Sequence, residues 1–177
     1  MEKKGIKESR KIVITGPESS GKTTLFEQLK TLSGFNFIPE YSRTYLEKIK
    51  RPYHYNDILQ IANYYVNELK SASQNKLSVI SDTDLLTLQI WCEFKYKKCH
   101  PFIMENLKIN PPDLYLICSS NIPWEFDPQR ENPNDRIELY NIHLDKIKEL
   151  GISFEIIEGN LSKRLNQAKK ILQNLEF

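Results

Sequence analysis

Cysteine, glycine and charge of one sign are all scarce in this sequence, and each scarcity excludes a class of protein. Only three of the 177 residues are cysteines, with neither a CxxC pair nor a Cys/His metal spacing, so no disulfide framework or zinc site is indicated. The 25 Lys and Arg residues against 23 Asp and Glu residues leave a formal net charge of +2. That balance is too small to indicate a nucleic-acid or anionic-membrane partner. Any phosphate binding must therefore be local.

Long apolar runs are also absent. No stretch approaches the roughly 18 consecutive apolar residues of a membrane-spanning helix, and the N-terminal segment MEKKGIKESRK lacks the apolar core of a signal peptide. We therefore expect a soluble protein in the reducing cytoplasm, without membrane association. A length of 177 residues with 40% hydrophobic residues suits a single domain, 1–177, in which residues 1–10 form a flexible N-terminus. Nothing in the sequence indicates an oligomeric state.

What is present is a phosphate-binding pattern. Two of only six glycines, Gly16 and Gly21, lie in the segment GPESSGKT, which matches G-x-x-x-x-G-K-[ST] at every fixed position. The segment follows the β-branched run at 11–15 and precedes a helical pattern, so backbone N–H groups and a helix N-terminus can face one anion. We expect Lys22 to reach the β- and γ-phosphates of ATP and the Thr23 hydroxyl to bind Mg²⁺. A glycine turn beside an ordinary surface lysine is the alternative. The predicted nucleotide-binding residues of this loop are Gly16, Glu18, Ser19, Ser20, Gly21, Lys22, Thr23 and Thr24.

Apolar runs along the chain predict five strands, at 11–15, 35–39, 77–80, 114–118 and 154–157, interleaved with helices. Runs without polar alternation are typical of parallel strands covered on both faces. We predict an α/β, P-loop kinase-like three-layer fold. Its five-stranded parallel sheet has the order 2-3-1-4-5 with helices on both faces, and ligands bind at the carboxyl ends of the strands.

Several classes of nucleotide enzyme share this loop. A GTPase needs an Asn-Lys-x-Asp element, but the only Asn-Lys pair, at 75–76, is followed by Leu77 and Ser78. A mechanical or AAA-type ATPase usually carries a longer sheet and an additional helical domain, for which 177 residues leave little room. A small phosphotransferase is therefore favoured. It needs a carboxylate that holds the metal, a base near the acceptor hydroxyl, and cations that close over the transferring phosphoryl group.

Candidates for these roles follow predicted strands. Asp82 follows the third strand and is expected to support Mg²⁺, and Asp84, two residues on, is expected to face the same way. Glu40 follows the second strand and is expected to act as general base toward a substrate hydroxyl. A helix N-cap or a solvated loop charge is the alternative for each carboxylate.

Residues 121–136 contain three of the nine prolines and are predicted to form a lid over the nucleotide. Arg130 and Arg136 in this segment suit contact with phosphate oxygens, because the planar guanidinium donates in a fork and stays charged. An ordinary surface arginine is the alternative for either. The three histidines, His54, His100 and His143, show no ligand spacing and are expected to be structural.

Four segments in order resemble the ribosylnicotinamide kinase domain of NadR-type proteins, a branch of P-loop, AAA-like ATPases. They are GPESSGKTTL at 16–25, EYSRTY at 40–45, DTDLLTLQIW at 82–91 and LYLICSSNIPWEFDPQRENPNDR at 114–136. The resemblance implies ATP-dependent phosphorylation of the 5′-hydroxyl of nicotinamide riboside to nicotinamide mononucleotide, in NAD salvage. The nucleotidyltransferase motif HxGH is absent from this sequence, so adenylation is not predicted.

The resemblance also places residues around the nucleoside. It implies Glu40, Tyr41 and Arg43 near the substrate, Asp84 near the ribose hydroxyls, and Trp124 and Trp91 against the cationic nicotinamide ring. Core packing is the alternative for Trp91, because it shares a helical face with Leu88 and Phe94.

Adenine is expected near the segment 158–160, where Gly159 permits close approach of the backbone. Arg164 is expected either to stack on the base or to be solvated. Three alternatives to a nicotinamide riboside kinase stay open. They are a regulatory ATPase that acts with a protein partner, a kinase for another nucleoside, and a nucleotide-binding module without turnover.

Overall fold

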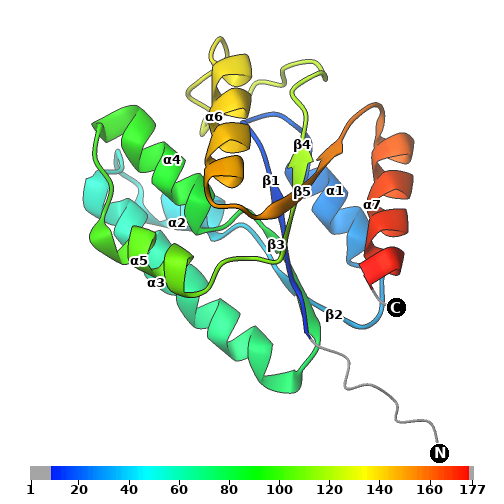
Figure 1. Ribbon diagram of the computed structural model, residues 1–177. Coiled ribbons are helices and arrows are strands. Elements are labelled where there is room, and N and C mark those ends of the chain that lie inside the picture. The colour runs from blue at the N-terminus through cyan, green and yellow to red at the C-terminus, as the bar shows by residue number, and fades with distance from the viewer. Residues whose placement is uncertain (1–8, 176–177) are drawn as a thin grey trace, which may run out of the picture.

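The computed structural model describes residues 9–175, so most of the predicted flexible N-terminus lies outside the described residues. Its strands are β1 (Lys11–Thr15), β2 (Phe35–Ile38), β3 (Ser78–Asp82), β4 (Leu114–Cys118) and β5 (Ser153–Ile157). Its helices are α1 (Lys22–Leu29), α2 (Tyr41–Ile49), α3 (Tyr55–Ala72), α4 (Leu85–Tyr96), α5 (Pro101–Ile109), α6 (Arg136–Glu149) and α7 (Leu161–Leu175), with a 3-10 turn at Ser73–Asn75. The strands form one parallel sheet in the order β2-β3-β1-β4-β5, as predicted (Figure 1).

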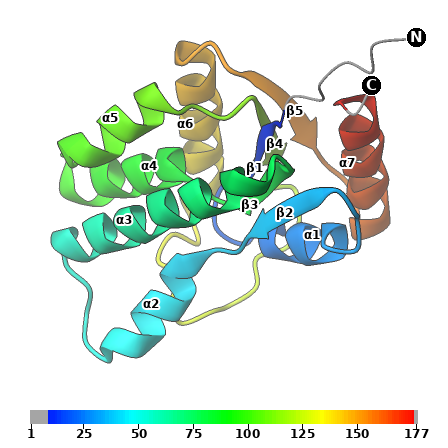
Figure 2. The ribbon, with the colours of Figure 1, turned by 90° about the horizontal axis from the view of Figure 1, so that it is seen from below.

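Helices cover both faces of the sheet, which confirms the predicted three layers. On one side α1 and α7 lie together, and on the other side α3, α4, α5 and α6 are stacked (Figures 1 and 2). Successive residues of β1 point to opposite faces: Ile12 and Ile14 pack with α1 and α7, whereas Val13 packs with the larger helical layer. The central strands are buried on both faces, which explains their uninterrupted apolar runs.

Two helices were not predicted from the sequence, and their burial explains why. Helix α6 buries only Leu139, His143 and Ile147, a narrow stripe at every fourth position among charged residues. Helix α5 has only 9 residues and buries Ile103 and Leu107. Both helices pack against α4, a contact that local patterning does not reveal.

The carboxyl ends of the strands carry the segments that the sequence singled out. The phosphate loop joins β1 to α1, and the predicted lid at 121–136 joins β4 to α6. In Figure 2 this lid passes between α1 and α2. Within residues 9–175 no helix combines the length and apolar character that a membrane span requires.

Candidate functional site

The phosphate loop has a backbone that requires its two glycines. Gly16 has φ of 135° and Gly21 has φ of 79°, and both values favour glycine. A Cβ atom on Gly16 would also lie 2.6 Å from the carbonyl oxygen of Cys118. Helix α1 begins directly after Gly21 without a side-chain cap. The first N–H groups of α1 are therefore available to an anion at the carboxyl end of β1.

Lys22, Thr23 and Asp82 lie together at this loop. The Lys22 ammonium donates to the carbonyl oxygen of Pro17 at 2.8 Å, and the Thr23 hydroxyl donates to Asp82 Oδ2 at 2.6 Å. The pairing of β1 with β3 brings Asp82 beside Ile14 and explains this contact across the sequence. Asp82 is the last residue of β3, rather than following it as predicted.

The Asp82 carboxylate shows a specific fit to a cation. Its second oxygen, Oδ1, is buried and has no hydrogen-bond partner. Burial and the neighbouring charge of Glu40 raise the pKa of Asp82 to about 7, while the charge of Lys22 opposes the shift. Carboxylate and hydroxyl oxygens suit Mg²⁺, which takes few protein ligands and completes its shell with water and phosphate oxygens. No cluster of three or more His, Cys, Asp or Glu suited to a metal occurs among residues 9–175.

A continuous cleft of about 740 Å³ is lined by the phosphate loop, by residues 42–46 of α2 and by residues 87–95 of α4. Glu40 lines it immediately before α2, and its carboxylate accepts a hydrogen bond from Ser42. The far end, which we call the acceptor end, combines aliphatic and aromatic side chains with two cations. Its residues are Arg43, Leu46, Leu88, Trp91, Phe94 and Lys95.

The lid contacts the phosphate loop through both predicted arginines. Arg136 donates to the carbonyl oxygens of Ser19 at 2.9 Å and Ile122 at 3.0 Å. Arg130 donates to the Ser19 hydroxyl at 3.3 Å. The Trp124 ring faces both guanidinium groups, with centroid distances of 5.9 Å and 5.8 Å. Arg130 lines the cleft, whereas Trp124 and Arg136 do not.

Asp84 does not face the same way as Asp82, so that prediction is wrong. Asp84 begins α4, where Oδ1 accepts the N–H groups of Leu86 and Thr87, and Oδ2 accepts the Tyr115 hydroxyl at 2.6 Å. Burial raises the pKa of Asp84 to about 6. The cause of the divergence is Thr83, whose φ of 65° turns the backbone and breaks the alternation of a strand.

Three further side chains make contacts that the sequence did not suggest. Tyr41 stacks on Tyr64 with ring centroids 3.6 Å apart and does not line the cleft. Glu18 turns its carboxylate to the lid, where it accepts the backbone N–H of Asn132 at 2.9 Å. Arg43 lines the cleft but pairs with Asp127 of the lid at 2.9 Å. The backbone N–H of Gln129, and after it Arg43, hold the pKa of Asp127 below its usual range.

Arg164 is neither stacked nor solvated. It is 3% exposed, and its guanidinium donates to the carbonyl oxygens of Ser20 at 2.6 Å, Gly159 at 2.7 Å and Ser119 at 3.1 Å. It also donates to Asn121 Oδ1 at 2.9 Å. Arg164 therefore joins the phosphate loop to the segments that follow β4 and β5.

A family comparison agrees with this arrangement. Residues 11–164, from β1 to the first turn of α7, match a family model described as an AAA domain. This chain belongs to that AAA domain family.

The AAA domain has two curated relatives with the same name, the trifunctional NAD biosynthesis/regulator protein NadR. This chain is 31% identical to NadR of Escherichia coli K12 over 157 residues. The matched segment covers 84% of this chain and 38% of the relative. This chain is also 31% identical to NadR of Salmonella typhimurium LT2 over 153 residues. That matched segment covers 82% of this chain and 37% of the relative. The resemblance to NadR-type proteins is thus confirmed, over well under two thirds of their length.

Solved structures share the fold. A crystal structure of NadR in complex with NR superposes with a TM-score of 0.76 at 21% identity, covering 95% of this chain and 51% of that one. Thymidylate kinase from Ehrlichia chaffeensis superposes with a TM-score of 0.66 at 17% identity, covering 94% of this chain and 100% of that one. These likenesses confirm the predicted P-loop kinase-like fold.

Several residues of the AAA domain's cleft were not predicted. Lys95 lies on α4 one turn after Trp91, so the spacing Thr87, Trp91, Lys95 is a sequence signal that could have found it. Glu131 of the lid lines the cleft and carries no such signal. Neither does Tyr53, which precedes α3, lies outside the cleft lining and contacts Glu131 and Trp91. His143 was expected to be structural, and its Nδ1 does bond to the carbonyl oxygen of Leu139 at 2.7 Å. His143 also lines the cleft, which was not predicted.

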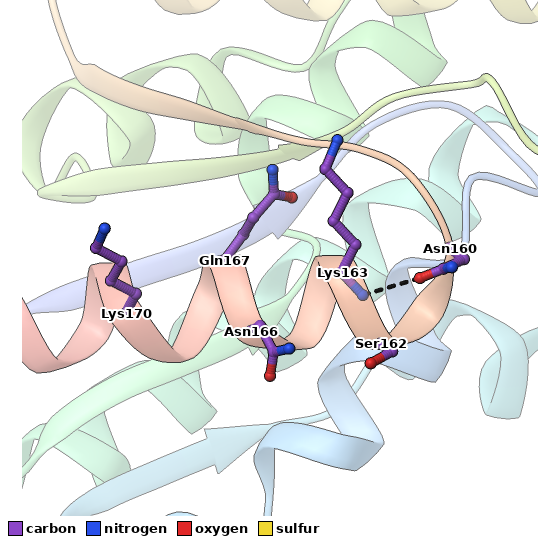
Figure 3. Close-up of a pocket in the computed structure, with 6 residues that line it drawn as sticks. All are labelled: Asn160, Ser162, Lys163, Asn166, Gln167 and Lys170. Carbon is purple, nitrogen blue, oxygen red and sulfur yellow. Dashed lines mark hydrogen bonds between the residues drawn. The ribbon is translucent and has the colours of Figure 1, made fainter.

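A second hollow lies along α7, away from the phosphate loop (Figure 3). Asn160 accepts the backbone N–H of Lys163 there at 2.9 Å. Figure 3 shows Lys163 and Gln167 rising from one side of the helix and Ser162 and Asn166 leaving the other. Because these side chains diverge, we place the candidate site of the AAA domain in the cleft.

Proposed function

We propose that this protein is an ATP-dependent small-molecule kinase that phosphorylates the 5′-hydroxyl of nicotinamide riboside to nicotinamide mononucleotide, a step of NAD salvage. The observation that carries the proposal is the continuous cleft that joins Lys22 and the Thr23–Asp82 pair to Glu40 and an aromatic acceptor end. The sequence similarity to NadR, named for NAD biosynthesis, supports it. The fold shared with a NadR structure in complex with NR adds support.

In this proposal the phosphate loop binds the nucleotide and the lid excludes water. The α1 N-terminus and Lys22 hold the β- and γ-phosphates, and Arg130 and Arg136 approach the transferring group from the lid. Thr23 and Asp82 would hold Mg²⁺, which, when bound, neutralises charge on the phosphate oxygens.

Glu40 is the proposed general base. As the substrate oxygen bonds to the γ-phosphorus, the bond from that phosphorus to the β–γ bridging oxygen breaks, and ADP leaves. The hydroxyl proton passes to the Glu40 carboxylate. Its place in the cleft, beside the loop that holds the phosphates, suits this role.

The acceptor end suits a cationic aromatic ring. We propose that Trp91 contacts the nicotinamide, because its indole lines the cleft and a cation is attracted to an aromatic face. Core packing of Trp91 is compatible with this role, since the same side chain also packs against the α3–α6 layer. Trp124 faces Arg130 and Arg136 instead.

We further propose ATP and Mg²⁺ as cofactors and a nucleoside as the small-molecule partner, with neither nucleic acid nor a membrane. The near-neutral charge of +2 is in keeping with such a partner. We also propose a cytoplasmic location, because the proposed reaction consumes ATP and feeds NAD synthesis.

Incubation of the purified protein with Mg-ATP and a panel of nucleosides tests the proposal. We expect nicotinamide riboside to yield nicotinamide mononucleotide and ADP in equal amounts, detected by chromatography and mass spectrometry, and Lys22→Ala to yield neither. Phosphorylation of another nucleoside alone would contradict the substrate. ATP turnover that ignores every nucleoside but rises with a protein partner would instead support the regulatory ATPase.

A further inference from the structure

A glutamate within a phosphate-binding loop is electrostatically unfavourable unless its carboxylate turns away from the phosphates. Glu18 does so by binding the lid. Its carboxylate accepts the backbone N–H of Glu131 at 3.0 Å and that of Asn132 at 2.9 Å, and an oxygen also accepts from the Asn132 side chain at 3.4 Å. Hydrogen bonds to an ionised acceptor are stronger than neutral ones. Glu18 therefore holds the lid backbone against the phosphate loop.

The side chain of Glu131 extends from this point to the acceptor end of the cleft. Its carboxylate accepts the Tyr53 hydroxyl at 2.6 Å and the Lys95 ammonium at 2.9 Å. Lys95 also lies 4.0 Å from the centre of the Tyr53 ring. Burial and the bond to Glu131 raise the pKa of Tyr53, so its hydroxyl remains a donor at neutral pH.

Tyr53 in turn orients Trp91. The indole Nε1–H donates to the Tyr53 oxygen at 3.0 Å, and the two rings meet edge to face with centroids 5.0 Å apart. The indole has one N–H group, so this hydrogen bond selects the rotamer of the Trp91 side chain. A continuous set of hydrogen bonds thus runs from Glu18 through Glu131 and Tyr53 to Trp91.

We propose that Glu131 is a positioning residue that couples the phosphate loop to the acceptor end of the cleft. Its backbone is held by the loop through Glu18, while its side chain sets the Tyr53 hydroxyl and thereby the Trp91 indole. A nucleotide that shifts the lid changes the wall that receives the nucleoside, and the two ligands bind cooperatively. The inference rests on the proposed function only in naming the second ligand a nucleoside.

The chain contains two tryptophans, so a ¹⁵N-labelled sample gives two indole N–H signals, and Trp91→Phe identifies that of Trp91. We expect a non-hydrolysable ATP analogue to shift the Trp91 signal in the wild-type protein. The shift should be lost in Glu131→Ala and in the milder variant Tyr53→Phe. It should persist in Glu105→Ala, which truncates an exposed glutamate on α5.

A Trp91 signal that ignores the nucleotide in the wild type, or a shift that survives in Glu131→Ala, would overturn the proposal. A second measurement titrates nicotinamide riboside with and without the analogue. We expect the analogue to tighten wild-type binding by about fivefold or more, and this ratio to fall to about one in Tyr53→Phe. If the riboside does not bind at all, the proposed substrate fails while the indole signal still decides the role of Glu131.

Discussion

Replacement of Arg164 tests whether a single buried guanidinium holds the site together. Its donors reach the backbone carbonyl oxygens of Ser20, Ser119 and Gly159, and the side-chain oxygen of Asn121. These residues belong to the phosphate loop and to the segments after β4 and β5, so no local contact replaces the connection. In Arg164→Met the helix is retained and the side chain keeps much of its length, but all four oxygens lose the guanidinium as donor. The Asn121 oxygen still accepts the Ser119 hydroxyl at 2.6 Å.

The size of the effect follows from those bonds. A buried acceptor left unsatisfied costs about 1–3 kcal/mol, and water can reach some of the four oxygens. We therefore expect Arg164→Met to lower the free energy of unfolding by about 4 kcal/mol. For a domain of this size that loss corresponds to a fall in Tm of roughly 8–16 °C. Arg164→Lys, which keeps one ammonium, should lose about half as much.

Lys163→Met is the matched control, since it removes a neighbouring positive charge on the same helix. Lys163 is 57% exposed in its side chain and lies 3.6 Å from Glu158, a surface pair that contributes about 0–1 kcal/mol. Urea unfolding measures both variants, and titration with an ATP analogue measures the phosphate loop. If the free energy of unfolding of Arg164→Met lies within about 1 kcal/mol of that of Lys163→Met, the connecting role of Arg164 is refuted.

Three other substitutions test the site. Lys22→Ala should abolish phosphoryl transfer without unfolding the protein, as circular dichroism and product assays would show. Glu40→Gln should lower kcat by about 10²–10⁴-fold with little change in the affinity for ATP, and undiminished single-turnover rates would contradict its role as base. Burial lowers the pKa of His143 to about 4 from about 6.5 in an unfolded chain. As the pH falls, the unfolded state therefore binds the proton first. The contribution of His143 to the free energy of unfolding is fully present above pH 6.5, and up to about 3 kcal/mol of it is lost toward pH 4. The raised pKa values of Asp82 and Asp84 change the free energy of unfolding with pH in the opposite direction. Urea unfolding across this pH range should therefore compare the wild type with His143→Leu. The pH dependence of the free energy of unfolding in this variant should lack the contribution of His143.

Local chemistry explains why much of the fold was predictable. The phosphate loop needs glycine at two positive-φ positions, so its pattern is short and nearly unique. Strands buried on both faces need apolar residues throughout, so their runs are visible without an alignment. These two signals together predicted a parallel sheet with its ligands at the carboxyl ends of the strands.

The direction of individual side chains was harder to predict. The alternation that predicted a common direction for Asp82 and Asp84 fails at Thr83, where one residue with positive φ reverses the pattern. Arg164 was predicted either to stack on adenine or to be solvated. Its buried position could not be predicted, because the oxygens that bind it come from segments far along the chain. Such partners are not encoded in the spacing around a residue.

The sequence by itself determined the nucleotide loop, the parallel sheet and the family, because these depend on local backbone requirements and on runs of one residue type. Only the tertiary structure decided which charged groups face the cleft and which bind the protein itself. Glu18 and Glu131 show the difference, since Glu18 was predicted to bind the nucleotide and Glu131 was not predicted to have a role. Their bonds join the lid, the phosphate loop and α4, and long-range packing alone brings those three segments within hydrogen-bonding distance.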